Sequence, residues 1–334
     1  MEKYDIYAIG NALVDTEIEV TDADLAKFGV EKGFMTLVDE TRQQELLAHL
    51  EGHLVASKRA SGGSACNTVI AASYFGAKTF YSCKLADDDD GRFYLNDLQS
   101  AQVDYLPKFA EHHGISGKCL VLITPDAERS MNTFLGISET VGVDQLHLSV
   151  AANSKYIYIE GYLSSSPTAR EAVLKLREHA SQNGVKTALT FSDPAMVAYF
   201  KEPLLEMIGE GVDLLFCNEA EAMDFTGAST LDDAVEALKK YTKSFALTRG
   251  SKGALLFDGE QLIQVEPHKV EPIDTNGAGD LFAGAFMYAI TQGHSFADAG
   301  RLASLASATL VCQFGPRLRA DQYTSLLEQT LVPL

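Results

Sequence analysis

The segment Asp274-Thr275-Asn276-Gly277-Ala278-Gly279-Asp280 runs directly into the apolar stretch LFAGAF at residues 281–286. Small residues followed by an apolar run are typical of a tight loop that leads into a buried helix. The N–H groups of Gly277, Ala278 and Gly279 would then lie at the positive end of a helix dipole, which favours a bound phosphoryl group. Asp280 follows in the first turn, where its carboxylate can accept the proton of an attacking hydroxyl. A Gly-rich turn ending in Asp is also typical of an ordinary helix cap, so both interpretations stay open for this segment alone.

Around this loop, short runs rich in β-branched and aromatic residues alternate with longer helical patterns. That alternation predicts an α/β fold with a mostly parallel sheet. Strands are expected at 4–10, 78–83, 155–159, 186–191, 213–216 and 244–248. Helices are expected at 64–75, 167–182, 218–225, 231–241, 279–291 and 296–314, each with a capping residue near its start.

Two stretches, at about 12–38 and 116–134, break this alternation. In the second, extended runs flank a Pro125-Asp126 turn, which is typical of a hairpin. Both stretches are interpreted as a small β-rich lid inserted into the core, and the alternative is that they form extra edge strands of the main sheet. No repeat or linker is visible, so residues 1–334 are expected to form a single α/β domain with a discontinuous lid.

Two segments have residues suited to binding a hydroxylated acceptor. Asn11 and Asp15 follow the first expected strand, and ligands bind at the carboxyl edge of such strands in α/β folds. Gly62 and Gly63 precede a helix that carries Asn67 in its first turn, so a substrate can approach the backbone there. A loop Asp and a Ser-capped helix start are the ordinary alternatives for these segments.

Two later segments are candidates for nucleotide contacts. Asn218 and Glu221 follow an apolar strand and share one helical face, a spacing that can hold hydrated Mg²⁺, whereas the ordinary alternative is a capped helix. Thr248, Gly250 and Gly253 follow the next strand, and their glycines can let the backbone run along ATP or mark a hairpin.

Charged residues around these motifs allow one further prediction. Arg129 lies in the expected lid, and an Arg that closes over a transferring phosphoryl group would supply local positive charge. The ordinary expectation for Arg129 is an exposed side chain. The acidic run 87–90 is interpreted as a solvated loop.

Composition excludes several classes of protein. With 334 residues, 46% of them hydrophobic, the chain can bury a large core, and its net charge of -19 argues against nucleic acid or a membrane as partner. The five cysteines form no C-x-x-C pair, and the N-terminal apolar run is too short for a leader or a span, so a soluble cytoplasmic protein is expected. The dinucleotide fingerprint is missing after the first strand, which disfavours a nicotinamide dehydrogenase.

In this order, the motifs resemble those of the ribokinase family, the PfkB-type carbohydrate kinases. GGSACN at 62–67 with the segment 88–91 looks like the first family signature, and DTNGAGD at 274–280 looks like the second. The resemblance implies a three-layer α/β/α core with a β-rich lid, and an ATP- and Mg²⁺-dependent phosphotransferase that can also need K⁺ near 274–275.

The resemblance also assigns roles to the candidate residues. Asp280 would be the base, residues 277–279 the anion hole and Arg129 the lid arginine. Acceptor contacts would come from Asn11, Asp15, Gly62, Gly63 and Asn67. Asn218, Thr248, Gly250 and Gly253 would bind ATP, and Glu221 would bind Mg²⁺ through water.

GNALVD, KGFMTLVDE, TPDAERSMNTFLG, IEGYL and FGPR resemble most the nucleoside-phosphorylating bacterial members of that family that act on adenosine. By that likeness Met35, Leu37 and Met131 would line a nucleobase pocket. Ala86 and Ser304 depart from the usual family pattern. The resulting hypothesis is transfer from ATP to the 5′-hydroxyl of a nucleoside, adenosine first. Its alternatives are a sugar kinase for ribose or fructose and a non-catalytic ligand sensor, and the chain is expected to be a monomer or a homodimer.

Overall fold

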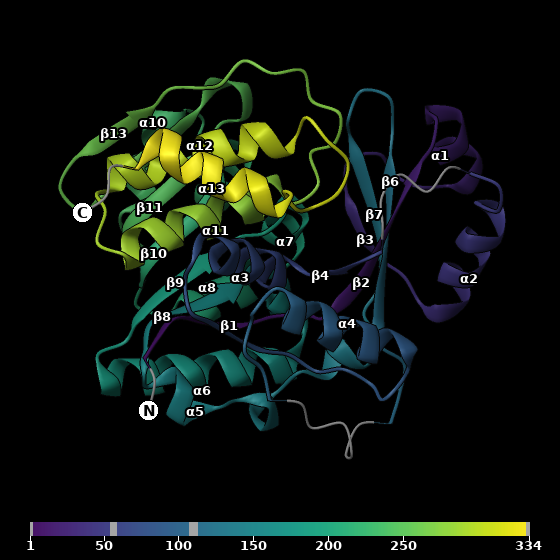
Figure 1. Cartoon of the computed structure of the whole chain (residues 1–334), viewed down its shortest axis with the longest axis horizontal. Coiled ribbons are helices and arrows are strands. Elements are labelled where there is room, and N and C mark those ends of the chain that lie inside the picture. The colour runs from purple at the N-terminus through teal and green to yellow at the C-terminus, as the bar shows by residue number, and fades with distance from the viewer. Residues whose placement is uncertain (1–2, 54–58, 107–112, 332–334) are drawn as a thin grey trace.

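A mostly parallel sheet of eight strands runs through the computed structural model (Figure 1). The structure describes residues 3–53, 59–106 and 113–331, so Met1 and Glu2 of the N-terminal run lie outside the described residues. In spatial order the strands are β13 (Leu262–Val265), β12 (Ala254–Phe257), β11 (Thr242–Thr248), β10 (Val212–Asn218), β9 (Lys186–Thr190), β8 (Ser154–Glu160), β1 (Tyr4–Ile9) and β5 (Thr79–Ser82). The neighbouring strands β5, β1, β8, β9, β10 and β11 run parallel to one another, and β12 and β13 add an antiparallel edge.

Helices cover both faces of this sheet, because alternate side chains of its central strands are buried on opposite sides. Ile6 and Ala8 of β1 belong to one apolar cluster, and Tyr7 and Ile9 belong to the other. The first cluster includes residues of α3 (Ser64–Phe75), α4 (Asp89–Ser100), α11 (Ala278–Thr291), α12 (Phe296–Leu310) and α13 (Ala320–Thr330). The second includes residues of α5 (Leu148–Ala151), α6 (Pro167–Asn183), α7 (Pro194–Tyr199), α8 (Lys201–Ile208), α9 (Glu219–Thr226) and α10 (Leu231–Leu238). The predicted three-layer α/β architecture is confirmed.

The acidic run 87–90 corrects one expectation, because it starts a helix rather than forming only a solvated loop. Asp88 caps α4 by accepting a hydrogen bond from the N–H of Gly91 (2.8 Å), and Asp89 and Asp90 lie in the first turn. Carboxylates are favourable at this end of a helix because they face the positive end of its dipole. The carboxylates of this run therefore mark the start of α4.

A second sheet of five strands stands beside the main body (Figure 1). Its order is β3 (Met35–Leu37), β7 (Arg129–Phe134), β6 (Gly117–Ile123), β2 (Leu13–Glu19) and β4 (Ala60–Gly62). The segments 12–38 and 116–134 contribute β2, β3, β6 and β7, and these strands pair in this sheet rather than at an edge of the main one. That this sheet acts as a lid within one domain stays a prediction.

The two faces of the small sheet have different neighbours. On one face, Leu120 and Leu122 of β6 pack in a cluster with residues of α1 (Asp22–Phe28) and α2 (Glu40–His49). On the other face, Cys119 and Val121 belong to a separate cluster that includes Met131. The alternation along β6 thus leaves one face of the sheet to line a cavity against the main body. Within the described ranges, no helix is both long and apolar enough to cross a membrane.

Candidate active site

The loop 274–280 leads into α11 as the sequence predicts. Asp274 fixes the loop from within, because Oδ1 accepts the N–H of Asn276 (2.8 Å) and Oδ2 accepts the N–H of Gly315 (3.0 Å). Gly277 is the N-cap of α11 with a φ of 71°, a conformation that glycine adopts without strain. No side chain caps the helix. The N–H of Ala278 donates to the carbonyl of Thr275 at 3.3 Å, whereas the N–H of Gly279 has no partner within the helix and is available to a ligand.

Glycine at 279 leaves space where an anion would have to approach these N–H groups. A Cβ at Gly279 would meet no atom within 4 Å, and Gly279 lines three neighbouring cavities. Gly277 lines the first of them and Ala278 the other two. This arrangement fits a phosphoryl group held between two binding cavities.

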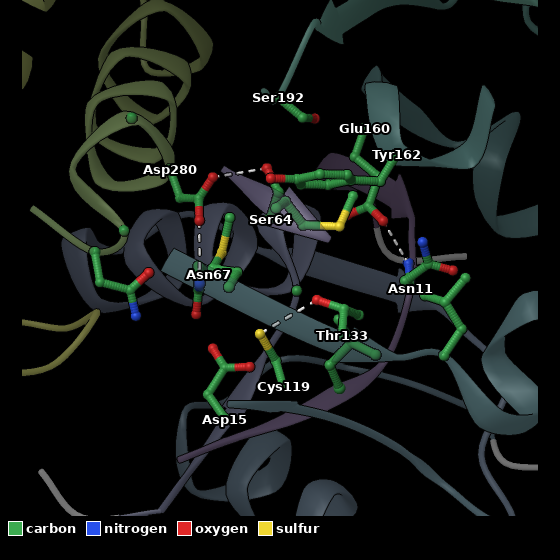
Figure 2. A pocket seen from close by; sticks show the side chains of 18 of the residues that line it. Asn11, Asp15, Ser64, Asn67, Cys119, Thr133, Glu160, Tyr162, Ser192 and Asp280 are labelled. Carbon is green, nitrogen blue, oxygen red and sulfur yellow. Dashed lines mark hydrogen bonds between the residues drawn. The ribbon is translucent and has the colours of Figure 1, made fainter. Parts of the chain in front are cut away.

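Asp280 points into the first cavity, where two side chains of α3 hold its carboxylate (Figure 2). Ser64 Oγ donates to Oδ1 at 2.7 Å, and Asn67 Nδ2 donates to Oδ2 at 3.0 Å. Burial raises the pKa of Asp280 above its ordinary value, although the hydrogen bonds from Ser64 and Asn67 act to lower it. A raised pKa brings a carboxylate closer to the basicity that a general base needs near neutral pH.

The predicted acceptor residues gather at the same cavity, with one exception. Asn11, Asp15, Gly63 and Asn67 line it, whereas Gly62 does not. Gly62 instead makes room for Asp15, since a Cβ at Gly62 would collide with the Asp15 carboxylate. Asp15 lies within β2 rather than in the loop that was expected after the first strand. The strand fixes its buried side chain more firmly than a loop would.

Glu160 also lines this cavity, although no role for it is predicted from the sequence. Its Oε1 accepts the N–H of Asn11 (2.6 Å) and its Oε2 accepts the N–H of Ala65 (2.7 Å), so one carboxylate joins the end of β1 to the start of α3. Gly10 lets it approach, because a Cβ there would lie 2.5 Å from Oε2. Burial raises the pKa of Glu160 to about 8. A Glu at the carboxyl end of an apolar parallel strand was the available signal.

Apolar side chains also line this cavity. Met35, Leu37 and Met131 line it, together with Leu13, Cys119 and Leu135. Met35 lies next to Met131 in the register of β3 and β7. Thr133 adds a hydroxyl, which donates to Cys119 Sγ at 3.3 Å (Figure 2). The cavity therefore combines polar groups such as Asp280 with apolar side chains that can pack on a flat ring.

Arg129 lines this cavity and a neighbouring one of about 300 Å³, so it is not simply an exposed side chain. Its Nη1 donates to Met131 Sδ at 3.3 Å, and no described carboxylate lies within ion-pairing distance of its guanidinium. The guanidinium is thus available to an anionic ligand.

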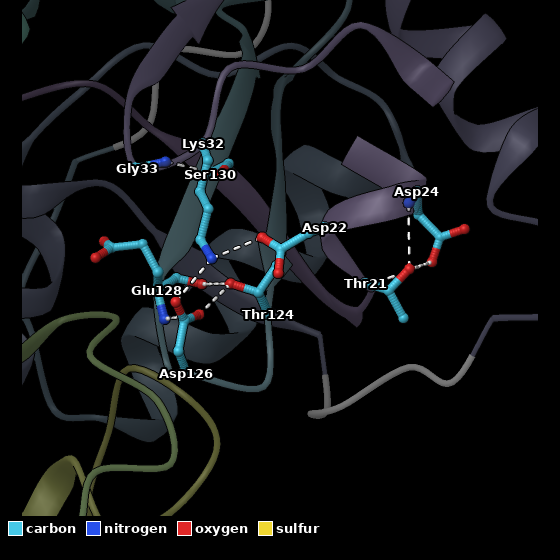
Figure 3. Close-up of polar contacts among 9 residues, drawn as sticks. All are labelled: Thr21, Asp22, Asp24, Lys32, Gly33, Thr124, Asp126, Glu128 and Ser130. Carbon is cyan, nitrogen blue, oxygen red and sulfur yellow. Dashed lines mark hydrogen bonds and ion pairs between the residues drawn. The ribbon is translucent and has the colours of Figure 1, made fainter. Parts of the chain in front are cut away.

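The turn before Arg129 is held at both ends (Figure 3). Lys32 Nζ bridges Asp126 and Asp22 at 2.7 Å each, and Thr124 Oγ1 donates to Asp126 Oδ1 at 2.6 Å. At the tip of the turn, Thr275 Oγ1 donates to the carbonyl of Ala127 at 3.2 Å. The hairpin that carries Arg129 therefore contacts the loop 274–280 directly.

A larger cavity, of about 520 Å³, lies on the other side of that loop. Thr248, Gly250 and Gly253 line it, along with Asn218 and Ser304. The hairpin interpretation of the glycine segment is confirmed, because β11 and β12 pair antiparallel across the turn that carries Gly250 and Gly253, and the contact with ATP stays a prediction. Ala278 and Gly279 close the cavity toward Asp280. Its size and position suit a nucleotide whose terminal phosphate reaches the start of α11.

Asn218 and Glu221 cap α9 reciprocally, which is the ordinary alternative that the sequence allowed. The N–H of Glu221 donates to Asn218 Oδ1, and the N–H of Asn218 donates to Glu221 Oε2, both at 2.8 Å. Glu221 Oε1 has no hydrogen-bond partner among the described residues, and Glu221 lines the 300 Å³ cavity with Asp193 and Arg129. Burial raises the pKa of Glu221 to about 7. No cluster of three metal-ligating side chains occurs in the described part of the chain.

Comparison with known proteins shows which family and which proteins this chain is similar to. Residues 37–322 match the model of the pfkB family carbohydrate kinases. Adenosine kinase of Saccharomyces cerevisiae is 30% identical over 95% of this chain and 97% of its own. The structure of adenosine kinase from Sinorhizobium meliloti superimposes with a TM-score of 0.92 at 33% identity, over 98% of this chain and 100% of that one. A probable sugar kinase from Rhizobium etli gives a TM-score of 0.91 at 32% identity, over 98% and 99%.

Proposed function

Because this chain belongs to the pfkB family of carbohydrate kinases, we propose that it transfers the γ-phosphoryl group of ATP to the 5′-hydroxyl of adenosine. Family membership makes it a kinase with a hydroxyl group as acceptor. Adenosine is supported by full-length likeness to adenosine kinases at 30% and 33% identity. The observation that carries the proposal is the shared cavity, which is lined both by the apolar side chains of Met35 and Met131 and by the carboxylate of Asp280.

The residues that line the cavity divide into two groups in this proposal. The apolar side chains would hold the adenine ring, and Leu37 would cover it from the rim of the small sheet. Asn11, Asp15 and Asn67 would bind the ribose hydroxyls, with Gly63 allowing close approach to the backbone. The 5′-hydroxyl would then face Asp280 and the start of α11.

The chain's own groups account for the transfer step. Asp280 takes the proton of the 5′-hydroxyl while Ser64 and Asn67 hold its carboxylate in place. The N–H groups of Gly277, Ala278 and Gly279, together with Arg129, stabilise the negative charge on the transferring phosphoryl group. Most of the catalytic effect in this class comes from such positioning and electrostatic stabilisation.

The nucleotide would lie in the larger cavity, along Thr248, Gly250 and Gly253 and beside Asn218. Glu221 would hold hydrated Mg²⁺ through water, and the ion would neutralise phosphate charge when bound. A K⁺ requirement near 274–275 belongs to the proposal as well. Both carboxylate oxygens of Asp274 already accept backbone N–H groups, so loop carbonyls would have to supply most of the ligands.

One assay tests the proposal: ADP release with adenosine, other nucleosides, ribose and fructose as acceptors. Selective stimulation by adenosine is expected. Selective stimulation by ribose or fructose would favour the sugar-kinase alternative, which the likeness to a probable sugar kinase supports. Stimulation by no acceptor would favour a ligand sensor. A cytoplasmic location and a monomeric or homodimeric state are part of the proposal.

A further inference from the structure

The loop between α12 and α13 contacts both sides of the reaction centre through three consecutive residues. The N–H of Gly315 donates to Asp274, as described above, and Pro316 packs on Gly277, where a Cβ would lie 2.9 Å from Pro316 Cα. Arg317 extends to the opposite side, toward residues 61–63, here called the acceptor loop. The segment 315–317 therefore bridges the two loops between which a phosphoryl group has to pass.

Arg317, Asp97 and Ser61 form a closed set of hydrogen bonds. Arg317 Nη1 donates to Asp97 Oδ2 at 2.6 Å, and Arg317 Nη2 donates to Ser61 Oγ at 2.7 Å and to the Ser61 carbonyl. Asp97 Oδ2 also accepts the N–H of Ser61 at 3.0 Å. The Arg317 side chain is only 15% exposed and Ser61 is fully buried. Charge-assisted bonds in such a site are strong, and removing one partner leaves the other buried and unpaired.

A shift of Ser61 would move the next residues of the chain, which contact groups that line the acceptor cavity. The next residue, Gly62, packs beneath the Asp15 carboxylate, and Gly63, with a φ of 95°, packs against the carbonyl of Asn11. Ser64, one residue further, holds Asp280. The positive charge of Arg317 also acts on Asp15. Burial is the main cause that raises the pKa of Asp15, and Arg317 acts to lower that pKa.

We propose that Arg317 is a positioning residue, which fixes the acceptor loop relative to the loop 274–280 so that the acceptor hydroxyl faces the phosphoryl group. This inference rests on the proposed kinase function. Reactive groups in enzymes must lie about 3–3.5 Å apart, and a misplacement of about 1 Å can cost 10²-fold in rate. The side chain touches neither substrate cavity, so its effect on the reaction passes through Ser61 and Gly62.

The test is Arg317→Met, which keeps most of the side-chain length and removes the hydrogen bonds. We expect kcat to fall by about 10²-fold and the KM for adenosine to rise, while the KM for ATP stays within about twofold of the wild-type value. Arg319→Met is the matched control, because Arg319 lies in the same loop, is exposed and, among the described residues, pairs only with groups of its own segment. It should behave as wild type. Arg317→Lys, which can reach one of the two partners, should restore part of the lost activity.

Several outcomes would overturn the inference. A folded Arg317→Met variant with wild-type kinetics would do so, and so would an equal rise in both KM values, which would indicate general structural support. If Arg317→Met does not fold, Arg317→Lys is judged by the same adenosine KM, and a wild-type value contradicts the proposal.

A wild-type chain that phosphorylates no acceptor would refute the proposed function separately. Amide hydrogen exchange then tests the positioning alone. Exchange at residues 61–64 should be faster in Arg317→Met or Arg317→Lys than in Arg319→Met, with residues 278–281 unchanged. Equal exchange at 61–64 would overturn the positioning role.

Discussion

Ser64 donates a 2.7 Å hydrogen bond to Asp280 although 216 positions separate them in sequence. The two residues lie in the first turns of α3 and α11, which pack closely because Gly284 lets α11 approach the carbonyl of Thr68. The candidate base is therefore oriented by the helix that begins at the acceptor cavity. Because both helices begin at the same place, the positive ends of their dipoles lie together, which gives this acidic chain a local positive potential there.

Replacing Asp280 with Asn should remove the base while keeping the shape of its side chain. Turnover should fall by about 10²–10⁴-fold, which is the usual contribution of general base catalysis, and both KM values should change little. ADP release at saturating substrates measures this. Ser64→Ala is the comparison, since it leaves the carboxylate and removes one of its two hydrogen bonds, so its loss should be smaller. Turnover retained in Asp280→Asn would refute the assignment.

Gly279→Ala should separate activity from stability. A Cβ there meets no protein atom, and Ala favours a helix over Gly by about 1 kcal/mol, so the free energy of unfolding should stay the same or rise slightly. The methyl group would occupy the space expected for the phosphoryl group, so kcat should fall strongly. Urea unfolding and ADP release measure the two effects. Gly277→Ala should lower both quantities, because it adds backbone strain and a clash with Pro316. Full activity in Gly279→Ala would place the anion elsewhere.

Arg129→Lys should lower kcat on the order of 10³-fold, the lower end of the effect of a catalytic arginine on phosphoryl transfer. Lys keeps the charge and loses the planar fork that binds phosphate oxygens in pairs. The midpoint of urea unfolding should change little, because the guanidinium hydrogen-bonds only to Met131 Sδ among the described residues. A loss of stability in step with the loss of turnover would assign Arg129 a structural role instead.

Met131→Ala should weaken the binding of adenosine more than the binding of a sugar acceptor. The lost apolar contact at the base end should cost about 1–3 kcal/mol, which corresponds to a 10- to 200-fold rise in the adenosine KM. Any slow turnover with ribose should fall less, because ribose has no base to contact Met131 and loses only the effect of the missing hydrogen bond from Arg129 to Met131 Sδ. If both acceptors lose equally, the apolar side chains do not form the base site.

Glu160 should give the stability of the chain a defined pH dependence. Burial raises the pKa of Glu160 from 4.5 to about 8, so the folded state binds a proton that the unfolded state has released between these pH values. The free energy of unfolding should therefore fall as the pH rises from about 4.5 to about 8. Asp280 and Glu221 have raised pKa values from burial and act in the same direction.

Urea unfolding of wild type and Glu160→Gln between pH 5 and 8 checks this prediction. The variant should show the smaller slope of stability against pH. Its stability should be lower at pH 5, because one amide oxygen cannot accept from both Asn11 and Ala65. Parallel slopes for the two proteins would show that Glu160 does not titrate in this window.

Sequence predicted best the features that depend on neighbouring residues. The loop 274–280 and its helix follow from small residues ahead of an apolar run, and the strands β8 to β11 follow from short β-branched runs between helices. Most candidate site residues, including Asp280, Asn67 and Met35, do line the cavities, because the carboxyl ends of parallel strands and helix N-termini meet at one edge.

Features that depend on distant contacts could not be predicted in this way. The role of Glu160 depends on Asn11 and Ala65, which lie 149 and 95 positions away in the chain. The place of Asp15 in β2 depends on pairing with β6, a hundred residues later. The charge of the acidic run alone predicts a loop at Asp88, whereas an Asp directly before a helix is also a capping signal, and Asp88 caps α4.

The proposed base and the proposed anion-binding N–H groups lie on the main body, at the start of α11, whereas Arg129 and the apolar residues Met35, Leu37 and Met131 belong to the small sheet. Under the proposed function, the contacts with the base of the acceptor and the proton-transfer step are thus encoded in separate pieces of the molecule. Substitutions at Met35, Leu37 and Met131 can accumulate without replacing Asp280 or Arg129, so new acceptors can be acquired gradually, by evolution or by protein engineering.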